Sequence, residues 1–279
     1  MNPRISIIVP CYMQAQYLGE ALQSVYEQSF QEWECIIVND GSLDNTEEVA
    51  QKWVNRDSRF TYLSKENGGL SSARNFGISH SSGEFILPLD ADDYISKNYV
   101  ADALHSFAQD ASLKLVYCKA EKFGSQSGLW KLPIFSLSNL SKNNMIFCSA
   151  VFKKSDWNSV GGYDVKMNHG WEDWEFWISL LKNGGNVKQL ETIGFYYRVK
   201  EVSMVKQLDQ PKKEALLQYM SIKHSEFYVK QLGSYKKLND DVENTKDEFK
   251  RILKSKKFVC DLFFKTFFGF TLFGKYKKQ

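Results

Sequence analysis

Short apolar segments of strand length alternate with amphipathic segments of helix length through residues 1–120 of this chain. The expected strands are residues 5–10, 34–39, 60–64 and 84–89, and the expected helices are residues 17–28, 44–55 and 70–80. Continuous, β-branched strands separated by helices are typical of a parallel sheet that is covered on both faces. The pattern therefore predicts an α/β fold. Further strands are expected at residues 113–118, 146–152 and 193–199.

Each of the first four strands is followed by a polar cluster. The clusters are residues 10–12, 39–42, 66–69 and 90–93. Ligands of parallel α/β sheets bind beyond the carboxyl ends of the strands. Because all four clusters fall at such ends, the sequence predicts a ligand pocket at one edge of the sheet.

The cluster at residues 90–93 is acidic and directly follows the apolar run 85–89. Asp90, Asp92 and Asp93 place three carboxylates within four positions, where they repel one another unless a cation binds. Oxygen ligands without a neighbouring His or Cys suit Mg²⁺ or Mn²⁺ rather than zinc. The alternative is a solvated acidic turn before the helix expected near Ser96, since Asp is favoured at helix starts.

Two other clusters offer polar groups to a ligand. Asp40 can accept hydrogen bonds at a strand end, although a simple glycine turn explains the same residues. Gly68 belongs to a glycine pair before a helix, whose N-terminus attracts anions. Arg74, on the first turns of that helix, can reach a phosphate or a carboxylate of the acidic cluster, or can form a structural ion pair. Neither a P-loop nor a GxGxxG motif is present.

Glu172 and Asp173 open a helix that is rich in tryptophan. One interpretation is that their negative charge favours the helix dipole and that the tryptophans belong to the core. The other is that a carboxylate acts as a general base in a partly apolar cleft, where desolvation holds its pKa near the working pH. The residues alone leave both interpretations open.

The C-terminal segment is basic and aromatic. Residues 251–279 contain eight Lys or Arg side chains and one acid, Asp261, so this segment carries +7 while the first 250 residues carry −4. Lysines frame the phenylalanine-rich stretch 258–273, which predicts a helix lying in a membrane interface beside anionic headgroups. The alternatives are packing on the body of the protein or on a second copy, as a homodimer. No nucleic-acid partner is expected, because the basic residues bracket an apolar block.

The cysteines and the N-terminus indicate a cytoplasmic location. The five cysteines are odd in number, widely spaced and without metal-binding spacing, so we expect reduced thiols. The first residues lead directly into a strand, and no signal peptide is expected. No apolar run of about 18 residues is available to span a membrane. Together with the C-terminal segment, these features predict a protein that is peripheral on the inner face of the cell membrane.

Six segments, in this order and spacing, resemble the family 2 glycosyltransferases. They are residues 6–12, 38–42, 67–69 with 73–75, 90–92, 161–164 and 172–173. The resemblance extends from about residue 4 to residue 200. It implies a GT-A fold, with a Rossmann-like, mainly parallel sheet flanked by helices over residues 1–205. A helical C-terminal region, residues 206–279, would follow.

The resemblance also implies an activity. It is that of an inverting, hexosyltransferase-type enzyme that moves a sugar from a nucleotide-diphospho sugar, expected to be UDP-linked, to a hydroxyl acceptor. The acceptor would be a glycan or a lipid-linked glycan in cell-surface polysaccharide synthesis. Two alternatives are an enzyme that loads a sugar onto a polyprenyl phosphate and a non-catalytic module that binds nucleotide sugars or glycans.

Transferred to this sequence, the family's donor site assigns roles to residues of the first clusters. Pro10 and Tyr12 would line the nucleotide base, and Asp40 would accept a hydrogen bond from it. Gly68 would adjoin the donor, and Arg74 would lie beside the base or the phosphates.

The resemblance assigns the remaining roles to the acidic residues. Asp90 would contact the ribose or the metal, and Asp92, the second Asp of the DXD motif, would ligate Mn²⁺ or Mg²⁺ at the diphosphate. Asp173 would be the base that deprotonates the acceptor, with Glu172 beside it. At position 200 many family members have His, whereas this chain has Lys200, which can neutralise the diphosphate as a point charge.

Overall fold

The computed structural model describes residues 3–201 and 209–276. The chain divides into two compact units, Met1–Ser225 and Glu226–Gln279. The domain boundary expected near residue 205 lies outside the described residues. Beyond that segment, the first unit continues to Ser225.

The first half of the sheet is parallel, as the alternating pattern predicts. It contains β1 (Ile5–Cys11), β2 (Trp33–Asp40), β3 (Phe60–Lys65) and β4 (Phe85–Pro88). These strands lie in the order β3-β2-β1-β4, and all of their pairings are parallel. The side chains of β1 and β4 are buried along their whole length, which explains why both strands are continuously apolar.

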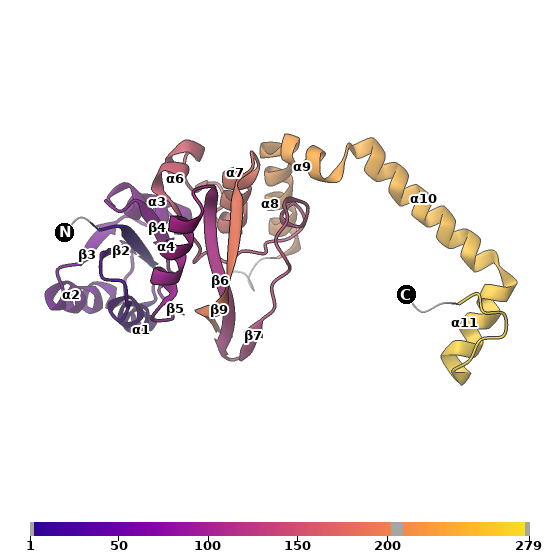
Figure 1. The fold of residues 1–279 in the computed structure, drawn as a ribbon, viewed down its shortest axis with the longest axis horizontal. Helices are drawn as coiled ribbons and strands as arrows, with labels where there is room; N and C mark the ends of the chain where they lie inside the picture. The colour runs from indigo at the N-terminus through magenta and orange to yellow at the C-terminus, as the bar shows by residue number, and fades with distance from the viewer. Residues whose placement is uncertain (1–2, 202–208, 277–279) are drawn as a thin grey trace. The chain divides into compact units, whose positions relative to one another are not determined.

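Amphipathic helices connect these strands (Figure 1). They are α1 (Ala15–Tyr26), α2 (Thr46–Arg56) and α3 (Leu70–Ser79), and a fourth helix, α4 (Tyr99–Gln109), follows later in the chain. Helix α3 packs against β1 and β2, and α1 packs against α2. The contact of α3 with the sheet is close at Gly77, where a Cβ atom would lie 2.6 Å from Ile8 and 2.9 Å from Val38. A larger residue at this position would push α3 away from the sheet.

The second half of the sheet is mixed. It contains β5 (Tyr94–Ile95), β6 (Leu113–Gly124), β7 (Gly128–Trp130), β8 (Val151–Lys153) and β9 (Asn186–Val199). Strand β8 is antiparallel to both β4 and β6, whereas the long strands β6 and β9 run parallel, side by side (Figure 1). Strand β5 is antiparallel to β9. The fold is thus α/β, with a parallel half joined through β8 to a mixed half.

Strand β8 is much shorter than the strand expected over residues 146–152. The residues before it are buried, but two of their carbonyl groups accept hydrogen bonds from side chains instead of from a neighbouring strand. Trp177 Nε1 donates to the carbonyl of Ile146 at 2.9 Å, and the Tyr99 hydroxyl donates to that of Ser149 at 2.7 Å. Burial alone therefore made this segment look like a strand.

Helices α5 (Leu137–Leu140), α6 (Lys154–Val160), α7 (Glu172–Leu181) and α8 (Gln210–Lys223) complete the first unit. Trp174 and Trp177 of α7 are buried, so these two tryptophans belong to the core. Trp174 Nε1 donates to the carbonyl of Leu140 at 2.7 Å, which ties α7 to α5.

An ionic cluster attaches the end of α8 to α7 and explains why the first unit extends to Ser225. Lys223 Nζ lies 2.6 Å from Asp164 Oδ2 and 2.9 Å from Glu175 Oε1. His224 Nε2 lies 2.6 Å from the same Glu175 oxygen. Burial alone would raise the pKa of Glu175, but the hydrogen bonds from His224 and Lys223 outweigh it and lower that pKa.

The second unit is helical, as expected for the C-terminal region. Helix α9 (Ser225–Leu232) leads into α10 (Tyr235–Lys254) and α11 (Lys256–Phe268). Ser234 and Ser255 cap α10 and α11 by accepting hydrogen bonds from the backbone N–H groups of Lys237 and Phe258. Of the helices in the described part of the chain, none combines the length and the apolar character needed to cross a bilayer.

Candidate active site

The polar clusters meet at one edge of the sheet. Cys11, the last residue of β1, pairs with Asn39 of β2, and Leu89 after β4 donates a backbone hydrogen bond to Ile8 of β1. The residues that follow β1, β2 and β4 are therefore neighbours. This arrangement agrees with the edge predicted from the sequence.

The acidic cluster is a turn and does not begin a helix. The backbone N–H of Asp93 donates to the carbonyl of Asp90 at 3.1 Å. Strand β5 follows the turn directly, and α4 begins only after Asn98. Helix capping therefore does not explain the three carboxylates.

Asp40 organises the glycine loop before α3. It is nearly buried, and its carboxylate accepts hydrogen bonds from Lys65 Nζ at 2.7 Å and from the backbone N–H groups of Gly68 and Gly69 at 3.0 and 2.8 Å. A Cβ atom on Gly68 would lie 2.7 Å from Ser72 Oγ. The glycine thus allows the loop to close over Asp40.

The two residues expected beside the base differ in their exposure. Pro10 is buried within β1, whereas Tyr12 is 52% exposed just beyond the end of this strand. Of the two, Tyr12 is the side chain that can offer an aromatic face to a ligand.

Arg74 joins the acidic turn to α7. Its guanidinium is fully buried and donates from Nη2 to Asp90 Oδ1 at 2.7 Å and from Nη1 to Glu172 Oε1 at 2.6 Å. The ring of Tyr163 lies beside it, with 5.4 Å between the guanidinium carbon and the ring centroid. Arg74 therefore has the ion-pair role that the sequence left open, and its expected place beside the base or the phosphates stays a prediction.

Asp90 and Glu172 are held by their neighbours. The second oxygen of Asp90 accepts a hydrogen bond from Cys148 Sγ at 3.4 Å, and burial followed by the charge of Asp90 raises the pKa of the Cys148 thiol. Glu172 is nearly buried against Arg74. Its carboxylate therefore acts as a counter-ion that positions α7. The sequence carried no signal for the contact between Cys148 and Asp90.

The end of β9 covers the acidic turn. Lys200 Nζ lies 2.5 Å from Asp92 Oδ2, and Arg198 Nε donates to the backbone carbonyl of Asp92 at 2.8 Å. Sequence reasoning missed Arg198, although it stands two positions before Lys200 in an extended segment, where alternate residues face the same side. These contacts place two cations, Arg198 of β9 and Lys200 directly after it, beside the DXD turn.

Asp93 is a structural member of the turn. It is buried, and its Oδ1 accepts a hydrogen bond from the backbone N–H of Arg198 at 2.7 Å. Burial, together with the charges of Asp92 and Asp90, raises the pKa of Asp93 well above its usual range. Asp92, with 18% of its side chain exposed, is the better placed of the two to meet a ligand.

Asp173 lies in the first turn of α7. Its Oδ1 accepts hydrogen bonds from Asn144 Nδ2 at 3.0 Å and from the backbone N–H of Trp174 at 2.8 Å. Removal from water, and then the charge of Glu172, raises the pKa of Asp173 to about 7. A carboxylate with this pKa can accept a proton at neutral pH. Nothing in the sequence pointed to Asn144.

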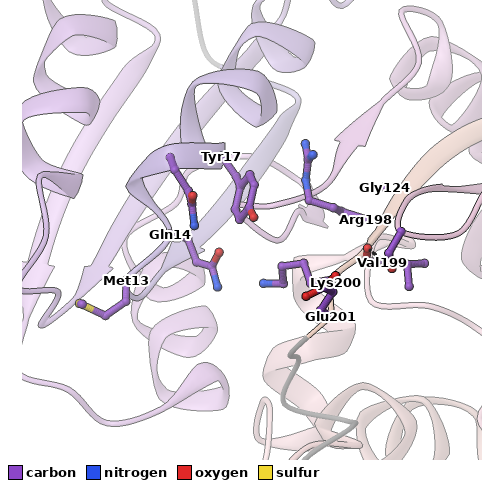
Figure 2. Close-up of a pocket in the computed structure, with 10 residues that line it drawn as sticks. Met13, Gln14, Tyr17, Gly124, Arg198, Val199, Lys200 and Glu201 are labelled. Atoms are coloured by element: carbon purple, nitrogen blue, oxygen red, sulfur yellow. Dashed lines mark hydrogen bonds between the residues drawn. The ribbon is translucent and has the colours of Figure 1, made fainter.

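A pocket of about 550 Å³ opens beside the pair formed by Asp92 and Lys200. Its walls come from Gln14 and the start of α1, including Tyr17, and from the ends of β6 and β9. Figure 2 shows Lys200 extending from β9 toward these α1 residues, and its Nζ lies 5.6 Å from the centroid of the Tyr17 ring. The pocket is large enough for part of a nucleotide sugar.

The carboxylates of the acidic turn fit a divalent cation whose other ligands are supplied by waters and by a diphosphate. Among residues 3–201 and 209–276, no three His, Cys, Asp or Glu side chains are grouped as metal ligands. The turn instead supplies two partly exposed carboxylates, Asp92 with 18% and Asp90 with 27% of the side chain exposed. Mg²⁺ is commonly held by one or two carboxylates together with waters and substrate phosphates.

Comparison with known sequences shows the family of this chain. The family model for glycosyl transferase family 2 matches residues 6–164, more than half of the chain. Chondroitin synthase of Pasteurella multocida (strain Pm70) is 31% identical over 217 residues, which cover 76% of this chain and 22% of that protein. Hyaluronan synthase of Pasteurella multocida is 31% identical over 186 residues, which cover 65% of this chain and 19% of that protein. The chain spans about a fifth of the length of these two relatives.

Solved structures share the fold. Residues 1–349 of TarS from S. aureus, in complex with UDP-GlcNAc, align with a TM-score of 0.67 at 21% identity, covering 78% of this chain and 66% of that chain. The mannosyltransferase PcManGT from Pyrobaculum calidifontis, in complex with GDP-Man and Mn²⁺, aligns with a TM-score of 0.59 at 17% identity, covering 91% and 82%. The fold is GT-A, and the chain belongs to glycosyl transferase family 2.

Proposed function

We propose that this glycosyltransferase transfers a sugar from a UDP-linked donor to a hydroxyl group of a growing surface glycan, with inversion at the anomeric carbon. The observation that carries the proposal is the bridge that Arg74 forms between Asp90 and Glu172. It connects the acidic turn to the helix of Asp173, so that a diphosphate site and a proton acceptor belong to one site. The names of the two synthases and the UDP-GlcNAc bound to TarS support this donor and acceptor class.

On the donor side, the diphosphate would lie against Asp92 and Lys200. Asp92, with Asp90 behind it, would hold Mn²⁺ or Mg²⁺, and the cation supplies positive charge to the departing diphosphate. The ammonium group of Lys200, 2.5 Å from Asp92, would add a second positive charge when the donor enters. The exposed ring of Tyr12 would stack on the base.

On the acceptor side, Asp173 would remove the proton from the attacking hydroxyl. Its pKa of about 7 leaves a substantial fraction ionised at neutral pH and still makes it an effective base. The hydrogen bond from Asn144 fixes the orientation of the carboxylate. Direct attack by the activated oxygen on the sugar, opposite the departing UDP, inverts the configuration of the anomeric carbon.

The aromatic tail, defined as residues 256–276, would bind the cytoplasmic face of the membrane. Its only acid, Asp261, is enclosed, and its carboxylate accepts backbone hydrogen bonds from Leu272, Phe273 and Lys275 at 2.6–2.7 Å. The lysines of the tail are exposed, and no exposed acid of the tail competes with anionic lipids for them. The tail also exposes five large aromatic side chains, Phe263, Phe267, Phe268, Phe270 and Phe273. Exposed aromatics framed by lysines favour an anionic membrane surface.

The release of UDP from a panel of UDP-sugars, with Mn²⁺ and glycan acceptors present, tests the catalytic proposal. We expect turnover with the wild-type protein, loss of turnover with Asp92→Ala, and normal turnover with the exposed helix control Asp247→Asn. An Asp173→Asn variant with unchanged turnover on hydroxyl acceptors would exclude the general-base role. Turnover that requires a polyprenyl phosphate, or donor binding without any turnover, would favour one of the two alternative functions.

A further inference from the structure

Helix α10 carries an apolar stripe that nothing in the second unit covers. Every residue of α10, all of which the structure describes, is at least partly exposed. The stripe repeats at intervals of three and four positions and consists of five apolar or aromatic side chains with one threonine among them: Tyr235, Leu238, Val242, Thr245, Phe249 and Ile252. Tyr235 is 84% exposed, Val242 50% and Phe249 61%. This spacing is the heptad pattern in which one helix packs against another.

A helix of this kind needs a partner for its stability. The 20 residues of α10 bury no side chain, so tertiary packing contributes little to the helix. Isolated helices are marginal in water, and in proteins most helical stability comes from the packing of an apolar face. The three ion pairs within α10, such as Lys236 with Asp240, are exposed and contribute little.

We propose that the stripe of α10 pairs with the same stripe of a second copy as a parallel, two-stranded coiled coil. With Tyr235, Val242 and Phe249 at the a positions, Asp241 falls at a g position and Lys246 at the following e position. In a parallel pair, each g residue faces the following e residue of the other helix. Asp241 of each copy therefore meets Lys246 of the other, which gives two opposite-charge contacts per dimer.

The charges of α10 select this partner and direction. An antiparallel pair would bring g positions against g positions, and these include the two acids Asp241 and Glu248. A membrane is a poorer partner for α10 than for the aromatic tail, because five acidic side chains offset the six basic ones of α10, whereas the tail carries only the enclosed Asp261. In one copy, Lys246 Nζ lies 2.8 Å from Glu243 Oε1, and this ion pair is exposed. In the dimer, Lys246 would pair with Asp241 of the second copy instead.

The association is independent of the transfer reaction and of the aromatic tail. It would place two catalytic units in one particle and would also double the number of aromatic tails. Two tails on one particle bind a surface more tightly than either tail alone, because the second contact is intramolecular. The dimer therefore gives the second unit a role that the catalytic site does not explain.

Charge-swap variants of the full-length chain, measured by sedimentation velocity, test the proposal. We expect the wild type to dimerise and both Asp241→Lys and Lys246→Asp to weaken dimerisation by about tenfold, since each replaces two attractive contacts by two repulsive ones. Mixing the two variants restores complementary charges in both contacts, so a heterodimer should form. The double variant D241K/K246D should self-associate like the wild type.

Matched control variants distinguish the effect of the α10 stripe and its flanking charges from the effect of changes elsewhere on the helix. The swap D247K/K250D on the outward face keeps its own ion pair and should leave the mass unchanged. The stripe variant Val242→Asp with Phe249→Asp should be monomeric and should retain UDP-sugar turnover, which shows that the first unit is folded. A monomeric wild type, or a dimer that survives the stripe variant, would overturn the proposal. Failure of the mixed charge variants to associate would overturn the parallel arrangement.

Discussion

Arg74 of α3 and Glu172 of α7 form a buried ion pair of 2.6 Å, although 98 residues separate them in the sequence. The same guanidinium donates to Asp90 at 2.7 Å. A planar, forked cation can satisfy two carboxylates at once, which a lysine cannot do with the same geometry. The position of the candidate base relative to the acidic turn therefore depends on one side chain.

Replacing Arg74 should destabilise the protein and disconnect the two sides of the site. Arg74→Met leaves the carboxylates of Asp90 and Glu172 without their cation, and removing one partner of such a buried pair costs about 3–5 kcal/mol. The measurement is urea unfolding of the first unit, with the partly exposed Arg59→Met as a control. Arg74→Lys should lie between the wild type and Arg74→Met. Equal stability of all variants would show that the bridge contributes nothing.

The rate should depend on the ionisation of Asp173. Its pKa of about 7 predicts that kcat/KM rises with pH and levels off above neutrality, as the carboxylate loses its proton. The hydrogen bond from Asn144 lowers this pKa, so Asn144→Ala should move the rise to higher pH. A pH profile of kcat/KM checks both expectations. A profile that Asn144→Ala does not shift would argue that another group titrates.

The same pKa has a consequence for stability. Asp173 has a higher pKa in the folded protein than in the unfolded chain, so folding favours its protonated form. This contribution is favourable at low pH and is lost as the pH rises from the ordinary range of Asp to about 7. In the wild type, this group lowers the free energy of unfolding as the pH rises toward 7. Asp173→Asn removes the group, so its free energy of unfolding should decrease less over the same pH range. Unfolding by urea at several pH values measures the difference, and parallel curves for the two proteins would contradict it.

Removal of Lys200 should affect the metal and the nucleotide in opposite directions. Its ammonium group competes with a cation for Asp92, so Lys200→Met should bind Mn²⁺ more tightly without a nucleotide. The same change removes a positive charge from the diphosphate site and should weaken UDP binding by about tenfold. Isothermal titration calorimetry measures both affinities. The control is Lys119→Met, which removes a lysine of β6 that pairs with Glu191 and not with the acidic turn. A parallel change of both affinities would contradict this role for Lys200.

Charged substitutions in the aromatic tail should weaken membrane binding. Phe267→Glu with Phe268→Glu replaces two exposed aromatic side chains by acids, which anionic lipids repel. We expect at least about a tenfold loss of binding to vesicles that contain phosphatidylglycerol, and further weakening of the wild type at high salt. Cosedimentation measures the bound fraction. Ile222→Glu, an equally exposed change on α8, should bind like the wild type, and equal binding of all three proteins would exclude the tail as the anchor.

The local sequence was sufficient to predict the strands whose side chains are buried on both faces of the sheet. The parallel strands β1, β2 and β4 were predicted because both of their faces are covered, which leaves mostly apolar runs. The segment before β8 has a similar apolar character but is not a strand, and two of its carbonyl groups bond to the side chains of Trp177 and Tyr99. The pattern of apolar residues in a sequence predicts which residues are buried, but it does not predict which group donates a hydrogen bond to a backbone carbonyl.

The sequence by itself determined which polar residues follow each strand, because strand ends are local features and parallel strands share one edge. It thereby pointed to Asp40 and Asp92, whereas Asp173 was assigned by the family resemblance and not by its position after a strand. Only the tertiary structure decided that Arg74 is buried between two carboxylates and that Asn144 and Arg198 contact Asp173 and the acidic turn. These contacts join segments that are far apart in the chain. Their strength depends on distance and exclusion of water, which no local pattern encodes.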